Sequence, residues 1–359
     1  MPKTPSFSND AKVIGLVWCP QPSALMYPSS SILISGGLGF IGSNLALALA
    51  DDGLPSTLVD SLNPSYGGHL RNIDPRSGDQ LLRTNISDVR DQHSLQVLLR
   101  EAHVLYNLAG QTSHMDSMAD PFTDLDINAR AQLSILEVCR EVAPQVRIVF
   151  ASTRQIYGRP HYLPVDEVHP LQPVDVNGIN KLAGEQYHLL YSEVYGIRST
   201  VLRLTNTYGP RMRIKDARQT FLGVWIRNLL QGQPFEIWGG EQLRDYTYVD
   251  DCVSALQLAA SSHAAIGEIY NLGGFGEPVS LLETAETLVA AARDLEIPIA
   301  AEPFVVREYP AERKKIDIGD YYADYSKISQ QLRWEPKVGL REGLKRTLAY
   351  YATELEHYL

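Results

Sequence analysis

Cysteine is scarce in this sequence, which has only three: Cys19, Cys139 and Cys252. They lie far apart in the chain, and none belongs to the closely spaced pairs that are typical of zinc sites. An odd and sparse set favours reduced thiols in a cytoplasmic protein over a disulfide framework. We therefore expect a cytoplasmic protein that has no metal site and whose cysteines are structural.

Long apolar runs are also absent. No stretch approaches the roughly 20 apolar residues that a helix needs to span a bilayer. The apolar piece from Val13 to Trp18 is followed by Pro20 and Pro22, and it lacks the basic segment that begins a signal peptide. We expect no membrane partner, and we expect residues 1–30 to form a loose arm outside the fold.

An excess of basic charge is missing as well. The 32 Lys and Arg residues are outnumbered by 42 Asp and Glu residues, which gives a net charge of −10. This balance argues against nucleic acid as a partner, because nucleic-acid binding favours a basic face. A few local cations and backbone N–H groups could still hold a small anion. With 44% apolar and 21% charged residues, the composition is that of a globular protein.

From Ser31 onward, short apolar runs alternate with helical patterns. The runs that predict strands cover 32–35, 56–60, 81–84, 104–108 and 146–150. The helical patterns between them cover 43–52, 92–100 and about 124–142. Strands separated by helices form parallel, doubly wound sheets that bind ligands at the carboxyl ends of the strands. The predicted fold class is therefore α/β with a Rossmann-type sheet.

The alternation changes at about residue 210. Helical patterns near 220–231, 250–261 and 281–293 and a short strand at 235–238 do not extend the repeat. We expect a dinucleotide-binding domain over residues 31–210. Residues 211–359 should mainly form a smaller α/β substrate lobe that is interleaved with the first domain.

Gly36, Gly39 and Gly42 lie between a predicted strand and a predicted helix. Glycine allows a tight turn there and lets a pyrophosphate approach the free N–H groups of the helix. Asp60 ends the next strand, 24 residues after Gly36, where a carboxylate can accept hydrogen bonds from ribose hydroxyls. Because that carboxylate would repel a 2′-phosphate, the predicted cofactor is NAD rather than NADP. The alternative is that Asp60 only begins a polar loop.

Several further motifs follow in a fixed order. They are Gly36-Gly37-Leu38-Gly39-Phe40-Ile41-Gly42, Asn107-Leu108-Ala109-Gly110, Ala151-Ser152-Thr153, Ile156-Tyr157-Gly158, Asn180-Lys181, the segment 203–210 and the segment 244–251. In these motifs the sequence resembles the extended short-chain dehydrogenase/reductase family, and specifically its nucleotide-sugar epimerase/dehydratase branch. The resemblance runs from Ile32 to about Tyr351.

The resemblance implies an enzyme that keeps NAD bound, oxidises a sugar hydroxyl to a ketone and later returns the hydride. Thr153 occupies the family's Ser/Thr position beside the reacting oxygen. Lys181 matches the lysine that binds the nicotinamide ribose and lowers the pKa of a neighbouring tyrosine. The residues expected to hold the cofactor are Gly36, Gly39, Phe40, Ile41, Gly42, Asp60, Asp88, Val89, Leu108, Ala109 and Lys181.

A nucleotide-sugar substrate is the second implied ligand. Asn206 and Arg244 fall where the family contacts the substrate diphosphate, and Arg313 or Lys314 should add a contact. Alternatively, Asn206 is a turn residue and Arg244 pairs with Asp245 at the surface. His114 follows the fourth predicted strand, where the family lines its active site, and it is either a proton shuttle or an ordinary loop residue.

The family pattern breaks at one position. Its tyrosine stands four residues before the lysine, and here that place holds Asn177. A carboxamide does not titrate in the useful range, so Asn177 can orient a sugar hydroxyl or a water but cannot act as a general base. Lys181, His114, Tyr157 or a bound water could take the proton instead. The remaining alternatives are a weak or specialised enzyme and a binding protein that has lost catalysis.

A second departure concerns the two residues after Thr153. Dehydratases of the branch carry Asp and Glu there, and decarboxylases carry Glu at the second place, but this chain has Arg154 and Gln155. Neither can serve as a carboxyl acid or base, whereas epimerisation by reversible hydride transfer needs neither. The leading prediction is an NAD-dependent epimerase acting at C4 of a UDP-hexose. A 2-epimerase, a ketosugar reductase and a non-catalytic NAD and nucleotide-sugar binding protein are the alternatives.

Two helical segments, 124–142 and 178–195, resemble those that form a four-helix dimer interface in the family. We therefore expect a homodimer. The nucleotide, the sugar and the carbon remain open at this point.

Overall fold

The computed structural model describes residues 32–63, 65–76, 78–218 and 220–359, apart from the side chains of Glu312 and Arg313. The arm predicted over residues 1–30 and Cys19 lie outside the described residues. Cys139 and Cys252 are buried free thiols. Among the described helices, none has the length and apolar character that a membrane crossing requires.

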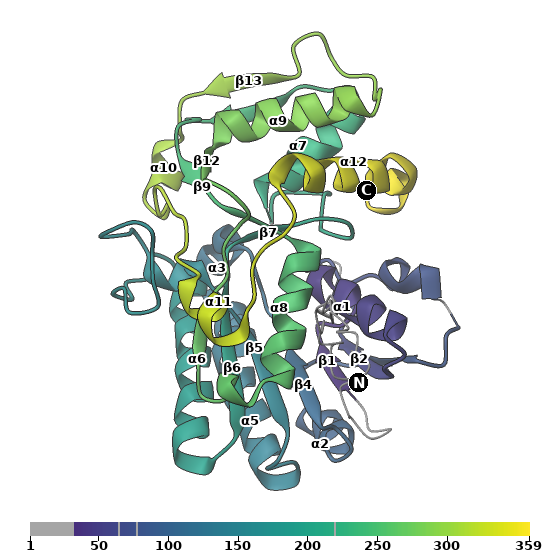
Figure 1. Cartoon of the computed structure of the whole chain (residues 1–359), viewed down its shortest axis with the longest axis vertical. Coiled ribbons are helices and arrows are strands. Elements are labelled where there is room, and N and C mark those ends of the chain that lie inside the picture. Colours follow the sequence, from purple (N-terminus) through teal and green to yellow (C-terminus); the bar gives the residue numbers. More distant parts are fainter. Residues whose placement is uncertain (1–31, 64, 77, 219) are drawn as a thin grey trace, which may run out of the picture.

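Seven parallel strands form the central sheet, in the order β11-β6-β5-β4-β1-β2-β3 (Figure 1). The order reverses beside β1, which places the ligand crevice of a doubly wound sheet at the end of that strand. This sheet confirms the predicted fold class. Its strands are β1 (Ile32–Ser35), β2 (Ser56–Asp60), β3 (Leu82–Ile86), β4 (Val104–Asn107), β5 (Arg147–Thr153), β6 (Arg198–Leu204) and β11 (Ile269–Asn271).

Helices cover both faces of the sheet, and the strand side chains alternate between the two cores. In β1, Ile32 and Ile34 face one core and Leu33 faces the other, as the two-residue period of a strand requires. The first core is closed by α1 (Phe40–Asp51), α8 (Val249–Ser261) and α11 (Ser326–Leu332). The second is closed by α2 (Gln92–Leu99), α5 (Ala131–Val142) and α6 (Val176–Tyr195).

The helix predicted over about 124–142 is interrupted in the structure. It consists of α4 (Pro121–Leu125), a π-helical turn η2 (Asp126–Arg130) and then α5. A π turn inserts one extra residue into the helical path and re-aims the side chains on it. Here the turn contains Asn128, which is fully buried and donates to the carboxylate of Asp124.

A smaller lobe lies above the sheet, at the end where the parallel strands terminate (Figure 1). Its core combines aliphatic and aromatic side chains, and the ring of Trp225 stacks on Phe235 at 5.0 Å. Its main elements are α7 (Phe221–Leu230), β8 (Phe235–Trp238), α9 (Leu281–Asp294), β13 (Phe304–Arg307) and α12 (Leu340–Glu354).

The other described elements are short. They are β7 (Asn206–Tyr208), β9 (Leu243–Arg244), β10 (Tyr246–Tyr248), β12 (Val279–Ser280), α3 (His114–Ala119), α10 (Ala311–Lys314), and the 3-10 helices η1 (Leu70–Arg76), η3 (Arg154–Tyr157), η4 (His263–Ala265) and η5 (Leu355–His357). Beyond residue 210, α8, β11 and α11 return to the sheet. The chain therefore alternates between lobe and sheet in its second half.

One ion pair is buried between α6 and β6. A guanidinium nitrogen of Arg203 lies 2.5 Å from Oε1 of Glu185, and the two side chains are only 2% and 0% exposed. Glu185 also accepts a hydrogen bond from Ser152 at 2.7 Å, and Arg203 donates to the hydroxyl of Tyr157 at 2.7 Å. Because each charge has lost its water, each depends on the other for compensation.

Replacing Glu185 with Ala should therefore leave the charge of Arg203 buried without its partner. We expect the free energy of unfolding to fall by roughly 3–5 kcal/mol, measured by chemical denaturation. The exposed pair Arg346–Glu342 supplies the matched control, because its side chains are 48% and 55% exposed. Glu342→Ala should cost less than about 1 kcal/mol. If both variants lost the same free energy of unfolding, the buried pair would stabilise the fold no more than an exposed pair does.

Candidate active site

The loop between β1 and α1 forms a cradle of backbone groups. Gly36 has a φ of +69°, a conformation that favours glycine. A Cβ on Gly42 would lie 2.2 Å from the carbonyl oxygen of Gly36, so only glycine allows the loop to pack this tightly onto α1. Gly39 precedes α1 without a side-chain cap, which leaves the N–H groups of the first turn, at Phe40, Ile41 and Gly42, available to an anion.

Asp60 closes this cradle at the end of β2. Its carboxylate accepts backbone hydrogen bonds from Leu38 at 3.1 Å and Leu62 at 2.9 Å. Burial raises the pKa of Asp60 above its usual range, although these N–H donors oppose the rise. The glycine loop and Asp60 thus stand side by side, and they fit the pyrophosphate and ribose of a dinucleotide.

The remaining residues expected around the cofactor differ in their placement. The backbone N–H groups of Leu108 and Ala109 lie 3.2 and 3.3 Å from Oγ of Ser35, which holds the end of β4 against the end of β1. Asp88 lies beyond β3, and its carboxylate is engaged by Arg90 at 2.7 Å. Val89 is buried in the core under α2 and α5.

Lys181 is buried at the first turns of α6. Its Nζ donates to the carbonyl of Ala151 at 3.1 Å and lies 5.1 Å from the ring centre of Phe150. Burial lowers the pKa of this lysine to about 8, against the opposing charge of Asp124. A Cβ on Gly110 would lie 2.9 Å from Nζ, so the strand-end loop after β4 runs directly past the ammonium group.

Asn177 is drawn toward α4 and is only 3% exposed. Its Nδ2 donates to the carbonyl of Gln111 at 2.8 Å and to Oδ2 of Asp124 at 3.0 Å. The same carboxylate accepts from Asn128 at 3.0 Å and from Asn180 at 2.8 Å. The carboxamide in the family's tyrosine position is therefore one of three amides that satisfy a fully buried aspartate.

His114 and Asp175 form a second pair at the start of α6. Nδ1 of His114 lies 2.9 Å from Oδ2 of Asp175, and the two side chains are 39% and 0% exposed. Asp175 caps α6 by accepting from the N–H of Gly178 at 2.6 Å and also accepts from Gln155 at 2.8 Å. Burial opposes ionisation of Asp175, but His114 and these donors outweigh it and lower its pKa.

Tyr157, one of the candidates for the missing proton acceptor, is unsuited to that role. Its side chain is 0% exposed, and its hydroxyl is bonded to Asn271 and Arg203, each at 2.7 Å. Burial raises its pKa to about 12, despite the neighbouring guanidinium. A phenol in these surroundings stays protonated and cannot reach a substrate.

Polar residues from the two halves of the chain meet beyond the end of β5. Oγ1 of Thr153 accepts from the N–H of Gln155 at 3.2 Å, which leaves its O–H free to donate. Nδ2 of Asn206 donates to the carbonyl of Asp245 at 3.0 Å, and its Oδ1 accepts from Arg154 at 2.9 Å. Arg244 is 7% exposed and lies 3.4 Å from Asp317, so it does not form the surface pair with Asp245.

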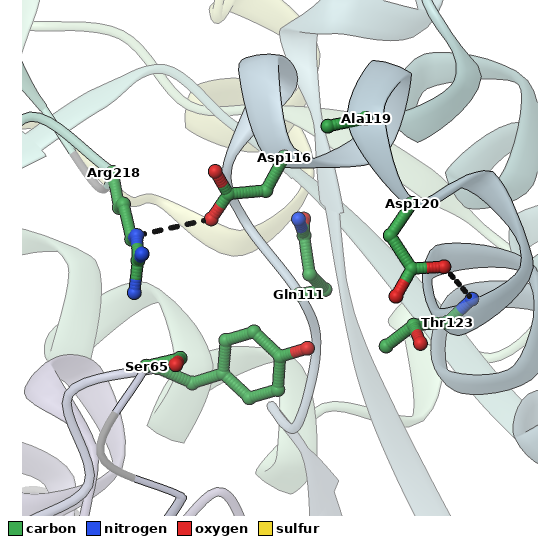
Figure 2. Close-up of a pocket in the computed structure, with 8 residues that line it drawn as sticks. Ser65, Gln111, Asp116, Ala119, Asp120, Thr123 and Arg218 are labelled. Atoms are coloured by element: carbon green, nitrogen blue, oxygen red, sulfur yellow. Dashed lines mark hydrogen bonds and ion pairs between the residues drawn. The ribbon is translucent and has the colours of Figure 1, made fainter.

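Two pockets lie beside these residues. The first, of about 220 Å³, is bounded by the loop after β2, by α3 and α4, and by Arg218, whose guanidinium pairs with Asp116 at 3.1 Å (Figure 2). It reaches Gln111, the residue to which Asn177 is bonded. The second, of about 520 Å³, includes Lys314 and Asp317 in its lining. Arg313 belongs to α10, and its side chain lies outside the described residues.

The sequence did not single out Asp124 or Asp175, although both organise this site. A signal for Asp175 was present, since an aspartate before a helical pattern is a favoured N-cap. Asp124 carries no comparable signal, because two of its three amide donors, Asn177 and Asn180, lie 53 and 56 positions away on α6.

Comparisons with known proteins agree with this geometry. The model of the NAD dependent epimerase/dehydratase family matches residues 32–273. The chain is 31% identical to UDP-glucuronic acid decarboxylase 1 of Xenopus tropicalis over 91% of its own length and 73% of that protein. It also resembles two solved structures of UDP-glucose 4-epimerases. One, from Thermotoga maritima with UDP-glucose, has a TM-score of 0.80 and 28% identity, over 90% of this chain and 99% of that one.

The other, from Thermus thermophilus in complex with NAD, has a TM-score of 0.77 and 28% identity, over 89% of this chain and 98% of that one. The glycine cradle and Asp60 fit the same cofactor, and the prediction of NAD is confirmed. Because the family model covers well over half of the sequence, the chain belongs to the NAD-dependent epimerase/dehydratase family, within the extended short-chain dehydrogenases/reductases.

Proposed function

We propose that this protein is an NAD-dependent epimerase of a nucleotide sugar, acting at C4 of a UDP-hexose by reversible hydride transfer. The proposal rests on the two side chains after Thr153, neither of which carries a carboxyl group. The guanidinium of Arg154 is bonded to Asn206, and the amide of Gln155 is bonded to Asp175. Dehydration and decarboxylation call for a carboxyl acid or base at these places, and epimerisation does not.

The substrate would lie between the ends of the strands and the smaller lobe. Asn206 and Arg244 supply an amide and a guanidinium for the diphosphate, and relatives that act on or bind UDP-sugars support this class of ligand. The hydroxyl of Thr153 would donate to the reacting sugar oxygen. NAD, when bound at the glycine cradle, supplies the acceptor and donor of hydride.

We assign the proton transfer to His114. Asp175 engages Nδ1, which leaves Nε2 as the nitrogen for the substrate, and the imidazole is 39% exposed where Asp175 is buried. Nε2 would take the hydroxyl proton as the alcohol becomes a ketone and return it when the ketone is reduced. Lys181 is a weaker candidate, because with a pKa of about 8 it is mostly protonated at neutral pH and has no free electron pair.

The state of Asn177 favours one rival of another class, a protein that binds NAD and nucleotide sugar without turning them over. Its carboxamide donates hydrogen bonds to Gln111 and Asp124 and cannot act as a proton acceptor for a substrate. A 2-epimerase and a ketosugar reductase remain the rivals among enzymes.

We further propose a homodimer that pairs along α6. Ile179, Leu190 and Val194 lie on one face of this helix, at intervals of eleven and four residues, and each is at least 50% exposed. Phe122 on the adjoining α4 is 75% exposed. An apolar stripe of this kind on a surface helix is typical of a protein interface.

The first test is proton NMR of the purified protein with NAD and a panel of UDP-, GDP-, CDP- and dTDP-sugars in D₂O. We expect inversion at one carbon without solvent deuterium, because a directly transferred hydride does not exchange with water. Stoichiometric consumption of added NADH would instead identify a reductase. Ligand-induced thermal stabilisation without any product would favour the binding protein, and Asn177→Tyr would then be examined for gained activity.

A second test concerns His114. In His114→Gln we expect kcat to fall by roughly 100- to 1000-fold with KM and NAD affinity unchanged, since general acid–base catalysis contributes in this range. Added imidazole should restore part of the rate. If Lys181 were the acceptor, the variant would keep its rate. The rate would then rise as the pH passes about 8, where the lysine loses its proton.

The dimer is tested by sedimentation velocity at micromolar concentration. We expect the wild-type protein to sediment as a dimer and Val194→Glu as a folded monomer, because a carboxylate within the stripe would be desolvated by the partner. Lys345→Glu, on an exposed helix of the smaller lobe, is the control and should remain dimeric. A wild-type monomer would reject the proposal.

A further inference from the structure

Arg154 occupies an unusual place, directly after Thr153 at the carboxyl end of β5 in the seven-stranded sheet. Its Nη2 donates to Asn206 at 2.9 Å, and its guanidinium carbon lies 5.4 Å from the ring centre of Tyr321. Its Nη1 is buried and has no hydrogen-bond partner among the described residues. A buried guanidinium with an unused donor lacks an acceptor, and the free energy cost of leaving it so is appreciable.

The two carboxylates near Arg154 have other hydrogen-bond or ion-pair partners. Arg244, a second cation, is the neighbouring charge that acts most strongly on it, and burial together with Arg244 lowers the pKa of Arg154 to about 10. Asp317 forms an ion pair with Arg244 at 3.4 Å. Asp245 accepts from the hydroxyl of Thr205 and from the backbone N–H of Ala323, and burial raises its pKa. Neither carboxylate therefore serves as the acceptor for Nη1 of Arg154.

We infer that Arg154 binds a carboxylate on the sugar ring, so that the preferred substrate is a nucleotide-linked uronic acid. A guanidinium is the side chain best matched to a carboxylate, because its parallel N–H groups pair with both oxygens. The ring of Tyr321 below it holds the plane of the guanidinium in place. A neutral hexose would leave Nη1 of Arg154 without a charged acceptor.

The position of Arg154 along the site favours the sugar over the diphosphate. Arg154 adjoins Thr153, next to the proposed reacting oxygen, whereas Arg244 belongs to β9 and contacts Asp317 and Gly319 on the side of the smaller lobe. A group on the ring carbon beside C4 would thus meet Arg154 first. This step rests on the proposed function, since it takes Thr153 to mark the reacting carbon.

The test compares UDP-glucuronate with UDP-glucose, which differ only at C6. For wild-type enzyme with NAD, we expect UDP-glucuronate to bind at least about 30-fold more tightly in titration calorimetry and to have the higher kcat/KM. In Arg154→Gln this preference should fall to about 3-fold or less, because binding of UDP-glucuronate weakens far more than binding of UDP-glucose. Arg154→Lys, which keeps the charge but loses the paired N–H groups, should retain part of it.

Arg341→Gln is the matched control, because that arginine is 59% exposed and pairs with Asp294 on the outer side of the smaller lobe. It should leave both sugars unchanged. Thermal denaturation of each variant shows that it is folded, and the wild-type comparison of the two sugars stands without any variant. Absence of a preference for UDP-glucuronate in wild type, including failure to bind either sugar, would overturn the inference. An equal loss for both sugars in Arg154→Gln would do the same and would assign Arg154 to the diphosphate.

Failure of this inference and failure of the proposed reaction give different results. If UDP-glucose is epimerised as well as UDP-glucuronate, the epimerase proposal holds and the role of Arg154 is wrong. If neither sugar is epimerised but UDP-glucuronate binds in a manner that depends on Arg154, the inference holds and the epimerase proposal fails.

Discussion

The buried carboxylate of Asp175 is the constraint on which the site depends. An ion that has lost its water must be compensated by donors, and the donors of Asp175 come from three segments: His114 of α3, Gln155 of η3 and the first turn of α6 at Gly178. Satisfying this one group therefore fixes the start of α6 against the end of β5. Lys181 lies six residues further along the helix, so its place beneath the loop after β4 follows from the same cap.

Asp124 gives the second point of attachment and explains how the chain accommodates Asn177. A large phenol is replaced by a small amide, and the amide turns inward to a carboxylate that two other asparagines already serve. The replacement is thus compensated within the fold, and it leaves His114 as the exposed titratable group at the start of α6.

The sequence was sufficient for those parts of the fold that depend on local patterns. The alternation of strands and helices, the glycine turn and the carboxylate at Asp60 are set by neighbouring residues, and the structure has the strands within a few residues of their predicted positions. It was insufficient where contacts join distant segments. His114 and Asp175 are 61 positions apart, and nothing in either neighbourhood indicates the other. The π turn at Asp126–Arg130 was not predicted, because the helical sequence pattern continues on both sides of it. In the structure it is marked by the burial of Asn128.

The net charge of the protein and the charges inside the site must also be considered separately. The net charge of −10 concerns the whole surface, and it argues against a general affinity for polyanions without describing the site. Within the site, Lys181 and Arg244 are buried cations and Arg154 is partly buried, and burial strengthens the field that each exerts on a ligand. An acidic protein can therefore still carry cations within its site. Under the proposed function, selection among nucleotide sugars would depend on where those cations stand relative to the ring.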